Sequence, residues 1–113
     1  MSTPVVRLSP SDCTARLSSG KAVLVDIREP SEWKDGVASQ AVLLPMSDLN
    51  GSRAQWKPFL DAVGRKEILL YCAAGGRAGK VAQLLASEGF TTANAGGFSE
   101  WRDSGWPIAQ ATP

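Results

Sequence analysis

Short, unbroken apolar runs alternate with segments of helical pattern along this 113-residue chain. The clearest runs lie at 22–25, 41–44 and 68–71, the last within a predicted strand at 67–71, and a shorter candidate strand lies at 91–97. An apolar run without polar alternation is typical of a strand that is covered on both faces, as in a parallel sheet. Strands of this kind, separated by helices, predict an α/β fold with about five mainly parallel strands, flanked by helices on both faces.

Capping residues mark the first predicted helix, in segment 8–20. Ser9 is placed to cap it, Pro10 suits its first turn, and Gly20 is expected to end it.

Four further helices are predicted, at 30–36, 51–64, 77–90 and 98–107. Pro58 is expected to disturb the middle of the second of these. In the third, Val81, Leu84 and Leu85 form one apolar stripe, and Gly89 suits the position just after the last turn.

The chain shows no internal repeat, low-complexity tract or linker, and its length suits one hydrophobic core. We therefore predict a single domain over residues 1–113, in which residues 1–5 and 109–113 are frayed ends.

Charge is balanced, with 12 Lys and Arg against 11 Asp and Glu. Without a basic cluster for a phosphate backbone, we expect no nucleic-acid partner. No apolar run has the length that a bilayer requires, so we expect no membrane partner either. The first twelve residues lack a charged leader followed by an apolar segment, and we expect a cytoplasmic location.

The chain has no histidine and two cysteines, Cys13 and Cys72. The missing histidine excludes Ser-His-Asp and Cys-His catalysis and the common histidine-containing zinc sites, and we expect no metal. In a reducing compartment the two cysteines are expected to be free thiols, with Cys13 a packing residue of the first helix.

The stretch "CAAGGR" joins the strand at 67–71 to the helix that follows. Cys72 and Arg77 are separated by four residues with no side-chain donor. Ligands bind beyond the carboxyl ends of such strands, where the free N–H groups and positive end of the next helix face the site. Glycine lets the backbone curl so that successive N–H groups converge on an anion.

Three stretches together resemble the rhodanese family of sulfurtransferases. "YCAAGGRAGKVAQLLASEGF" is similar to the family's active-site segment, "LVDIREPSEWKDG" to its first signature, and "NAGGFSEWRDSGWPI" to its C-terminal signature. The resemblance implies transfer of sulfane sulfur from thiosulfate or a similar donor to cyanide or a thiol, through a cysteine persulfide and without a cofactor. The implied partners are a small-molecule sulfur donor and a thiophilic acceptor.

The resemblance also implies a role for each matching residue. Cys72 would be the nucleophile and persulfide carrier, Arg77 would brace the loop, and Asp26 and Arg28 would pair and support it. The residues of the loop and anion cradle would be Ala73, Ala74, Gly75, Gly76, Arg77 and Ala78.

Four positions depart from the family pattern. Ala73 stands where many members carry Arg or Lys, and Ala78 stands where Ser or Thr is frequent, so the pocket has less charge for thiosulfate. Lys80 or Arg102 would have to supply it. In the turn after "DG", Val37 replaces a usual histidine and Gln40 a common glycine.

Two alternatives follow from these features. A cysteine phosphatase or arsenate reductase of the same fold would place five residues between cysteine and arginine, and a loop with four is too narrow for phosphate. A sulfur-relay or regulatory module would act on a protein sulfur acceptor and have weak thiosulfate activity.

Outside the loop, Glu29 and Glu32 are predicted to be solvated carboxylates at a helix start. Of the four tryptophans, Trp33 and Trp101 are predicted to fill the core. Trp56 and Trp106 are predicted to lie at the surface or pocket rim.

Overall fold

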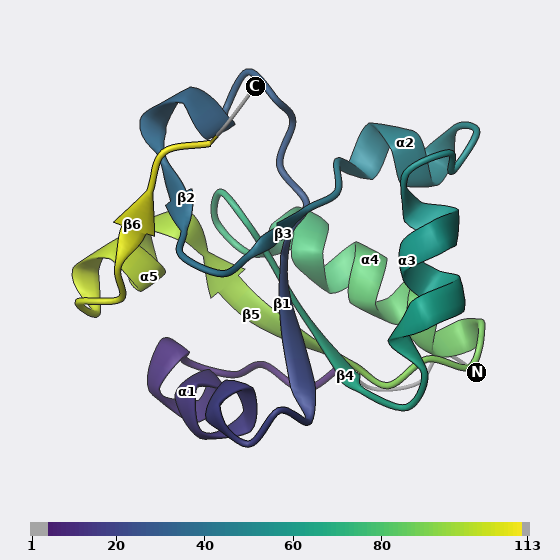
Figure 1. Ribbon diagram of the computed structural model, residues 1–113, viewed down its shortest axis with the longest axis horizontal. Helices are drawn as coiled ribbons and strands as arrows, with labels where there is room; N and C mark the ends of the chain where they lie inside the picture. The colour runs from purple at the N-terminus through teal and green to yellow at the C-terminus, as the bar shows by residue number, and fades with distance from the viewer. Residues whose placement is uncertain (1–4, 112–113) are drawn as a thin grey trace.

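A computed structural model describes residues 5–111 and shows an α/β fold (Figure 1). The elements follow one another as α1 (Pro10–Ser18), β1 (Ala22–Asp26), the 3-10 helix η1 (Trp33–Asp35), β2 (Val37–Ala38), β3 (Val42–Leu43), α2 (Met46–Asn50), α3 (Trp56–Val63), β4 (Glu67–Cys72), α4 (Gly76–Ser87), β5 (Thr92–Gly97), α5 (Phe98–Asp103) and β6 (Ile108–Ala109).

The central sheet has four parallel strands in the order β3-β1-β4-β5. The predicted class is therefore confirmed, with four strands in place of about five. The two remaining strands, β2 and β6, form a separate antiparallel pair. A single bridge between Arg7 and Asn94 lies on the outer edge of β5.

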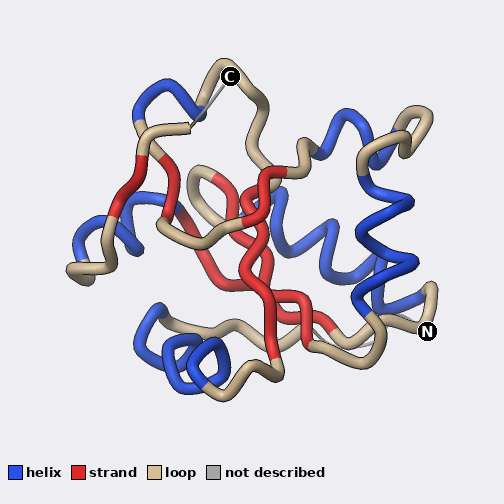
Figure 2. The backbone as a smooth tube through the Cα atoms, in the orientation of Figure 1, coloured by secondary structure: helices blue, strands red, loops and turns tan. Residues whose placement is uncertain are grey.

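Helices cover both faces of this sheet, as predicted. Alternate residues of β4 point to opposite faces, so Leu70 and Cys72 pack with α2, α3 and α4, whereas Leu69 and Tyr71 pack with α1 and α5. The strands lie between these two groups of helices (Figure 2). The loop between the end of β4 and the start of α4 lies at the carboxyl end of the sheet.

Each of the two core clusters contains one fully buried tryptophan. Trp56 and Trp101 are fully buried, and their indole N–H groups donate to the carbonyls of Pro45 (2.9 Å) and Ala95 (2.8 Å). Because Trp56 lies in the core, its predicted surface or rim position is wrong. Trp33, predicted to fill the core, is only partly buried.

The first helix begins as predicted. Ser9 caps α1 by accepting from the Asp12 N–H (3.2 Å), while the Asp12 carboxylate accepts from the Ser9 N–H (3.1 Å). Gly20 follows with φ of 76°.

Two predictions for the other helices are wrong in detail. Pro58 does not disturb α3, because it is the third residue of the helix, where the missing N–H would have no intrahelical acceptor. In α4, Val81 and Leu85 are buried but Leu84 is 36% exposed. The small residues Ala78 and Ala82 complete the buried stripe, which lets α4 approach the sheet closely.

The described ends of the chain are held by contacts. Val5 packs against the first core cluster, and Ala109 pairs with Val37 between β6 and β2. The predicted frayed ends, 1–5 and 109–113, therefore do not include these two residues, and residues 1–4 and 112–113 lie outside the described part. None of the helices between residues 5 and 111 is long and apolar enough to span a bilayer.

Candidate active site

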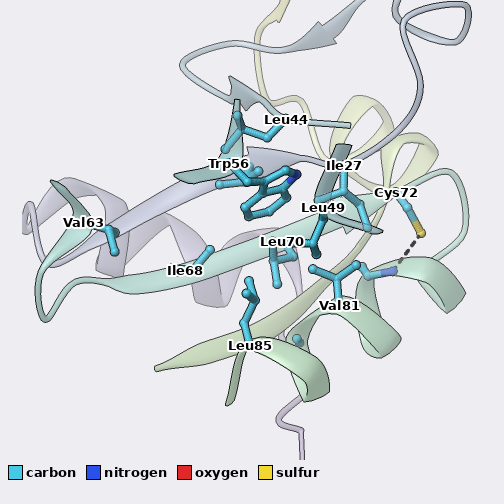
Figure 3. Close-up of a cluster of buried hydrophobic side chains, with 13 residues drawn as sticks. Ile27, Leu44, Leu49, Trp56, Val63, Ile68, Leu70, Cys72, Val81 and Leu85 are labelled. Atoms are coloured by element: carbon cyan, nitrogen blue, oxygen red, sulfur yellow. Dashed lines mark hydrogen bonds between the residues drawn. The ribbon is translucent and has the colours of Figure 1, made fainter. Parts of the chain in front are cut away.

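Cys72 is the last residue of β4, and its sulfur faces the start of α4. The backbone N–H of Gly75 lies 3.0 Å from Cys72 Sγ, and that of Ala78 lies 3.4 Å from it. The side chain is almost fully covered, with 1% of its surface exposed. Figure 3 shows Cys72 at the edge of the core cluster, with its sulfur turned towards the first turn of α4.

Glycines allow the loop after β4 to take this shape. Gly75 has a φ of 102°, a left-handed conformation that side chains disfavour, and it turns the chain into α4. Gly97 pairs with Cys72 across β5 and β4. A Cβ at Gly97 would meet the carbonyl oxygen of Ala73 and lie 2.9 Å from Ala74 Cα, so a bare backbone is needed there.

The amides of the predicted cradle differ in what they contact. Those of Gly75 and Ala78 reach the thiol sulfur directly. Gly76 and Arg77 open α4, and the first N–H groups of a helix have no acceptor within it. Ala73 and Ala74 are exposed at the outer side of the loop.

Arg77 binds a carboxylate that sequence reasoning placed in solvent. Its two terminal nitrogens donate to the two oxygens of Glu32, at 2.8 Å each. These hydrogen bonds, together with one from the Glu29 N–H (3.0 Å), hold the pKa of Glu32 at about 2. The same pair raises the pKa of Arg77.

The predictions of Glu29 and Glu32 as solvated carboxylates are therefore wrong. Glu29 accepts from the N–H (3.1 Å) and hydroxyl (2.6 Å) of Ser47 at the start of α2. Sequence spacing gives no signal for either pair, because the partners are far apart along the chain.

Asp26 and Arg28 form a buried ion pair behind the loop. The Arg28 guanidinium donates to Asp26 Oδ1 (3.1 Å) and Oδ2 (2.7 and 3.0 Å) and packs over the Phe98 ring at 4.2 Å. It also donates to the carbonyls of Gly36 (2.8 Å) and Glu32 (3.3 Å). The pair thus joins the end of β1 to the segment that carries the carboxylate partner of Arg77.

Two further residues near the loop were missed from the sequence. The Asn94 side chain donates to the Gly75 carbonyl (3.0 Å) and accepts from the Gly96 N–H (2.9 Å). An Asn placed two residues before a glycine pair is a turn signal that could have found it. Arg7 pairs with Glu100 (2.7 Å), and its guanidinium would lie 3.6 Å from a Cβ at Gly75.

The two cations named as possible sources of charge for the pocket, Lys80 and Arg102, are both exposed. Arg102 is exposed, contacts Asp103 and lies 5.9 Å from the Phe98 ring. Lys80 is exposed on α4. Within residues 5–111 there is no group of three or more His, Cys, Asp or Glu side chains that could hold a metal ion.

Comparison with known proteins agrees with this geometry. Residues 9–104 match the model of the rhodanese-like domain, so the chain belongs to the rhodanese-like family. It is 31% identical over 107 residues to the uncharacterized protein slr1261 of Synechocystis and 34% identical over 83 residues to the uncharacterized protein YqhL of Bacillus subtilis. These matches include 93% and 72% of this chain, but only 56% and 61% of the two relatives.

Solved structures share the fold. A rhodanese-related protein from Thermoplasma volcanium superposes with a TM-score of 0.76 at 24% identity, covering 94% of this chain and 99% of that one. A protein of unknown function from Rhodopseudomonas palustris, described as a possible tyrosine phosphatase, has a TM-score of 0.74 at 30% identity, covering 92% and 84%.

Proposed function

We propose that this domain is a sulfurtransferase that carries sulfane sulfur as a persulfide on Cys72. The observation that carries the proposal is the convergence of the Gly75 and Ala78 amides on Cys72 Sγ at the start of α4. A thiol held by backbone donors at the positive end of a helix is suited to carry negative charge on sulfur. Family membership supports the same class of reaction.

The reaction takes place in two displacement steps at sulfur. The Cys72 thiolate attacks the outer sulfur of thiosulfate, the bond between the two thiosulfate sulfurs breaks, and sulfite leaves with the electron pair. The terminal sulfur of the persulfide is then attacked by cyanide or a thiolate, and the Cys72 thiolate is released.

The loop suits the second sulfur as well as the first. That sulfur extends about 2 Å beyond Sγ, the length of one S–S bond. The N–H groups of Gly76 and Arg77 start α4 and have no acceptor within the helix, so they are available to the terminal sulfur. Each hydrogen bond to a charged group contributes about 1.5–3 kcal/mol, more than the helix dipole at about 0.3–1 kcal/mol.

Asp26, Arg28 and Arg77 would act as supports for this loop. Arg77 binds the Glu32 carboxylate, and Arg28 donates to the backbone carbonyl of the same residue, so two ion pairs joined by one backbone hydrogen bond connect the end of β1 to the first turn of α4. We assign them to holding the loop in shape, with the sulfur chemistry left to Cys72 and the amides.

Phosphate chemistry, suggested by the description of the Rhodopseudomonas palustris protein, is disfavoured here. Only four residues separate Cys72 from Arg77, which narrows the loop around a single atom. Both terminal nitrogens of Arg77 already bind Glu32, and a phosphatase would need that guanidinium for its substrate.

A sulfur-relay role with a protein acceptor is the second candidate. The observation that favours it is Ala73, which is exposed at the loop and offers no charge to hold the sulfonate of thiosulfate. Such a module would form the same persulfide but would work poorly with thiosulfate. Comparing thiosulfate, mercaptopyruvate and glutathione persulfide as donors separates the two roles.

Intact-mass spectrometry tests the persulfide directly. Incubation with thiosulfate should add about 32 Da, one sulfur atom, and cyanide or a thiol should remove it. Cys72→Ser should gain nothing, whereas Cys13→Ala should behave as the wild type. A wild-type protein that gains no sulfur from any of the three donors would overturn the proposal.

A further inference from the structure

We infer that Asn94 is a positioning residue for the Cys72 loop, an inference that rests on the proposed function for its kinetic consequence. Asn94 lies in β5, beside β4 in the sheet (Figure 1). It does not contact the sulfur. It acts through the peptide that joins Gly75 to Gly76, whose carbonyl oxygen accepts from Asn94 Nδ2 at 3.0 Å.

The backbone of Asn94 is fixed from both sides. It pairs with Leu70 in β4 on one side. On the other, its N–H donates to the Val6 carbonyl (2.9 Å) and its carbonyl accepts from the Leu8 N–H (2.9 Å). A carboxamide carried by a strand that is paired on both sides is held more firmly than one carried by a loop.

Both ends of the carboxamide have a partner, which fixes its orientation. Oδ1 accepts from the Gly96 N–H (2.9 Å), so the NH₂ group must face the Gly75 carbonyl (3.0 Å). A leucine of similar size would supply neither bond. Asn94 therefore ties the loop after β4 to the turn after β5.

The hydrogen bond from Asn94 to the Gly75 carbonyl fixes the direction of the Gly76 N–H. The Gly75 carbonyl also accepts from the Gly79 N–H (3.0 Å), so it points along α4 towards its carboxyl end. In a planar trans peptide the N–H points opposite to the C=O. The Gly76 N–H is thus directed out of the start of α4, the side on which Gly75 and Ala78 bind Cys72 Sγ.

Gly79 provides the space for this arrangement. A Cβ at residue 79 would lie 3.2 Å from Asn94 Nδ2, so a methyl group there would displace the carboxamide by a few tenths of an ångström. Glycine in a helix interior is otherwise unfavourable relative to alanine.

Thr92 offers a matched control on the same face of β5. Its hydroxyl donates to the Ala82 carbonyl of α4 (2.7 Å), away from the Cys72 loop. Asn94→Leu and Thr92→Val each remove side-chain hydrogen bonding between β5 and a backbone carbonyl of the α4 segment. Only the first removes a bond to the loop.

The experiment compares wild type, Asn94→Leu, Thr92→Val and Gly79→Ala by two measurements. In Asn94→Leu, kcat for sulfur transfer from thiosulfate to cyanide should fall about tenfold, because a misdirected Gly76 N–H loses about one hydrogen bond to sulfur in the transition state. In Thr92→Val, kcat should stay within about twofold. Amide proton shifts of Gly75 and Gly76, measured by NMR, should change in Asn94→Leu and not in Thr92→Val.

Gly79→Ala separates positioning from stability. Its melting temperature should equal or exceed that of the wild type, while kcat falls several-fold and the Gly75 and Gly76 amide shifts move as in Asn94→Leu. If Asn94→Leu folds poorly, kcat and the Gly75 and Gly76 amide shifts of Gly79→Ala test the positioning role by themselves.

The outcomes distinguish the inference from the proposed function. A wild type without sulfur transfer would defeat the proposed function, and the amide shifts would still decide the positioning role. Unchanged shifts in Asn94→Leu and Gly79→Ala, or an equal loss of kcat in Thr92→Val, would overturn the role of Asn94.

Discussion

The two cysteines are equally buried yet lie in different chemical surroundings. Cys13, in α1, is 0% exposed and packs among apolar side chains on one face of the sheet, whereas Cys72 is 1% exposed and lies on the other. Both are free thiols, as predicted, and the sheet separates them. Burial raises the pKa of Cys13 to about 12, while Cys72 has two backbone N–H groups on its sulfur. Backbone donors, and not burial, therefore distinguish the candidate site from the packing position.

The largest expected difference is in alkylation of the two thiols. The pKa of Cys13 moves from 9.0 to about 12, so the folded protein at pH 8 has about a thousandfold less Cys13 thiolate than an unperturbed thiol would give. Iodoacetamide should therefore modify Cys72 first, and Cys13 only after denaturation. Peptide mass mapping measures both sites. Equal labelling of the two cysteines in the native protein would remove the contrast between them.

A second prediction concerns the arginine that braces the loop. Arg77→Ala should lower sulfur-transfer kcat/KM about tenfold or more, or ~1.4 kcal/mol of transition-state stabilisation, because Glu32 no longer holds the first turn of α4.

A remote ion pair provides the control for this variant. Arg53 and Glu88 form a pair of the same kind, with side-chain exposures of 33% and 32% against 34% and 33% for Arg77 and Glu32. Arg53→Ala should cost similar stability, within about 1 kcal/mol, and leave transfer unchanged. If Arg53→Ala reduces transfer as much as Arg77→Ala, the effect belongs to general stability.

The sequence predicts the fold more completely than the site because the two depend on different information. Apolar runs and capping residues are local signals, and they locate β1, β4, β5, α1 and α4. The two-residue strands β2 and β6 carry no such pattern and depend on a contact between distant segments. The same holds for Trp56, whose burial follows from how α3 packs on the sheet.

Within the site, the loop motif indicates Cys72 and Arg77, but the contacts that hold the loop join residues far apart along the chain. Glu32 is 45 residues from Arg77, and Asn94 is 19 residues from Gly75. Such pairs exist only once the parallel strands bring their carboxyl ends to one edge. The family motifs therefore indicated the loop and the Asp26–Arg28 pair, whereas nothing in the sequence indicated Glu32 as the partner of Arg77.

A third prediction uses the acidity of Glu32. Its pKa in the folded protein is about 2, below the ordinary 4.5, so the unfolded state takes up protons first as pH falls. The stability that Glu32 contributes is present above pH 4.5 and is lost as the pH falls towards 2. The contribution should be about 1 kcal/mol, because the side chain is a third exposed.

Urea unfolding of the wild type and Glu32→Gln measures this effect. The stability difference between them should be largest at pH 5–7 and narrow towards pH 2. Glu67, the first residue of β4, pairs with Arg16 in the last turn of α1 and gives a comparison through Glu67→Gln. A difference that stays constant down to pH 2 would contradict the ion-pair assignment.

The smallest effect should come from restoring charge beside Cys72. Ala73 is exposed, and an arginine there could pair with the sulfonate of thiosulfate. Exposed pairs contribute about 0.2–1 kcal/mol, so Ala73→Arg should lower KM for thiosulfate by up to about fivefold and leave kcat unchanged. Ala73→Gln, which adds a polar side chain without charge, should not lower KM, and the gain in Ala73→Arg should vanish at high salt.

The guanidinium of Arg7 already lies close to Gly75, so Arg7→Gln should make the Ala73→Arg effect larger if that cation contributes to donor binding. A KM that stays unchanged in Ala73→Arg, both alone and combined with Arg7→Gln, would mean that the amide donors, with no side-chain cation, determine how the Cys72 site receives its donor.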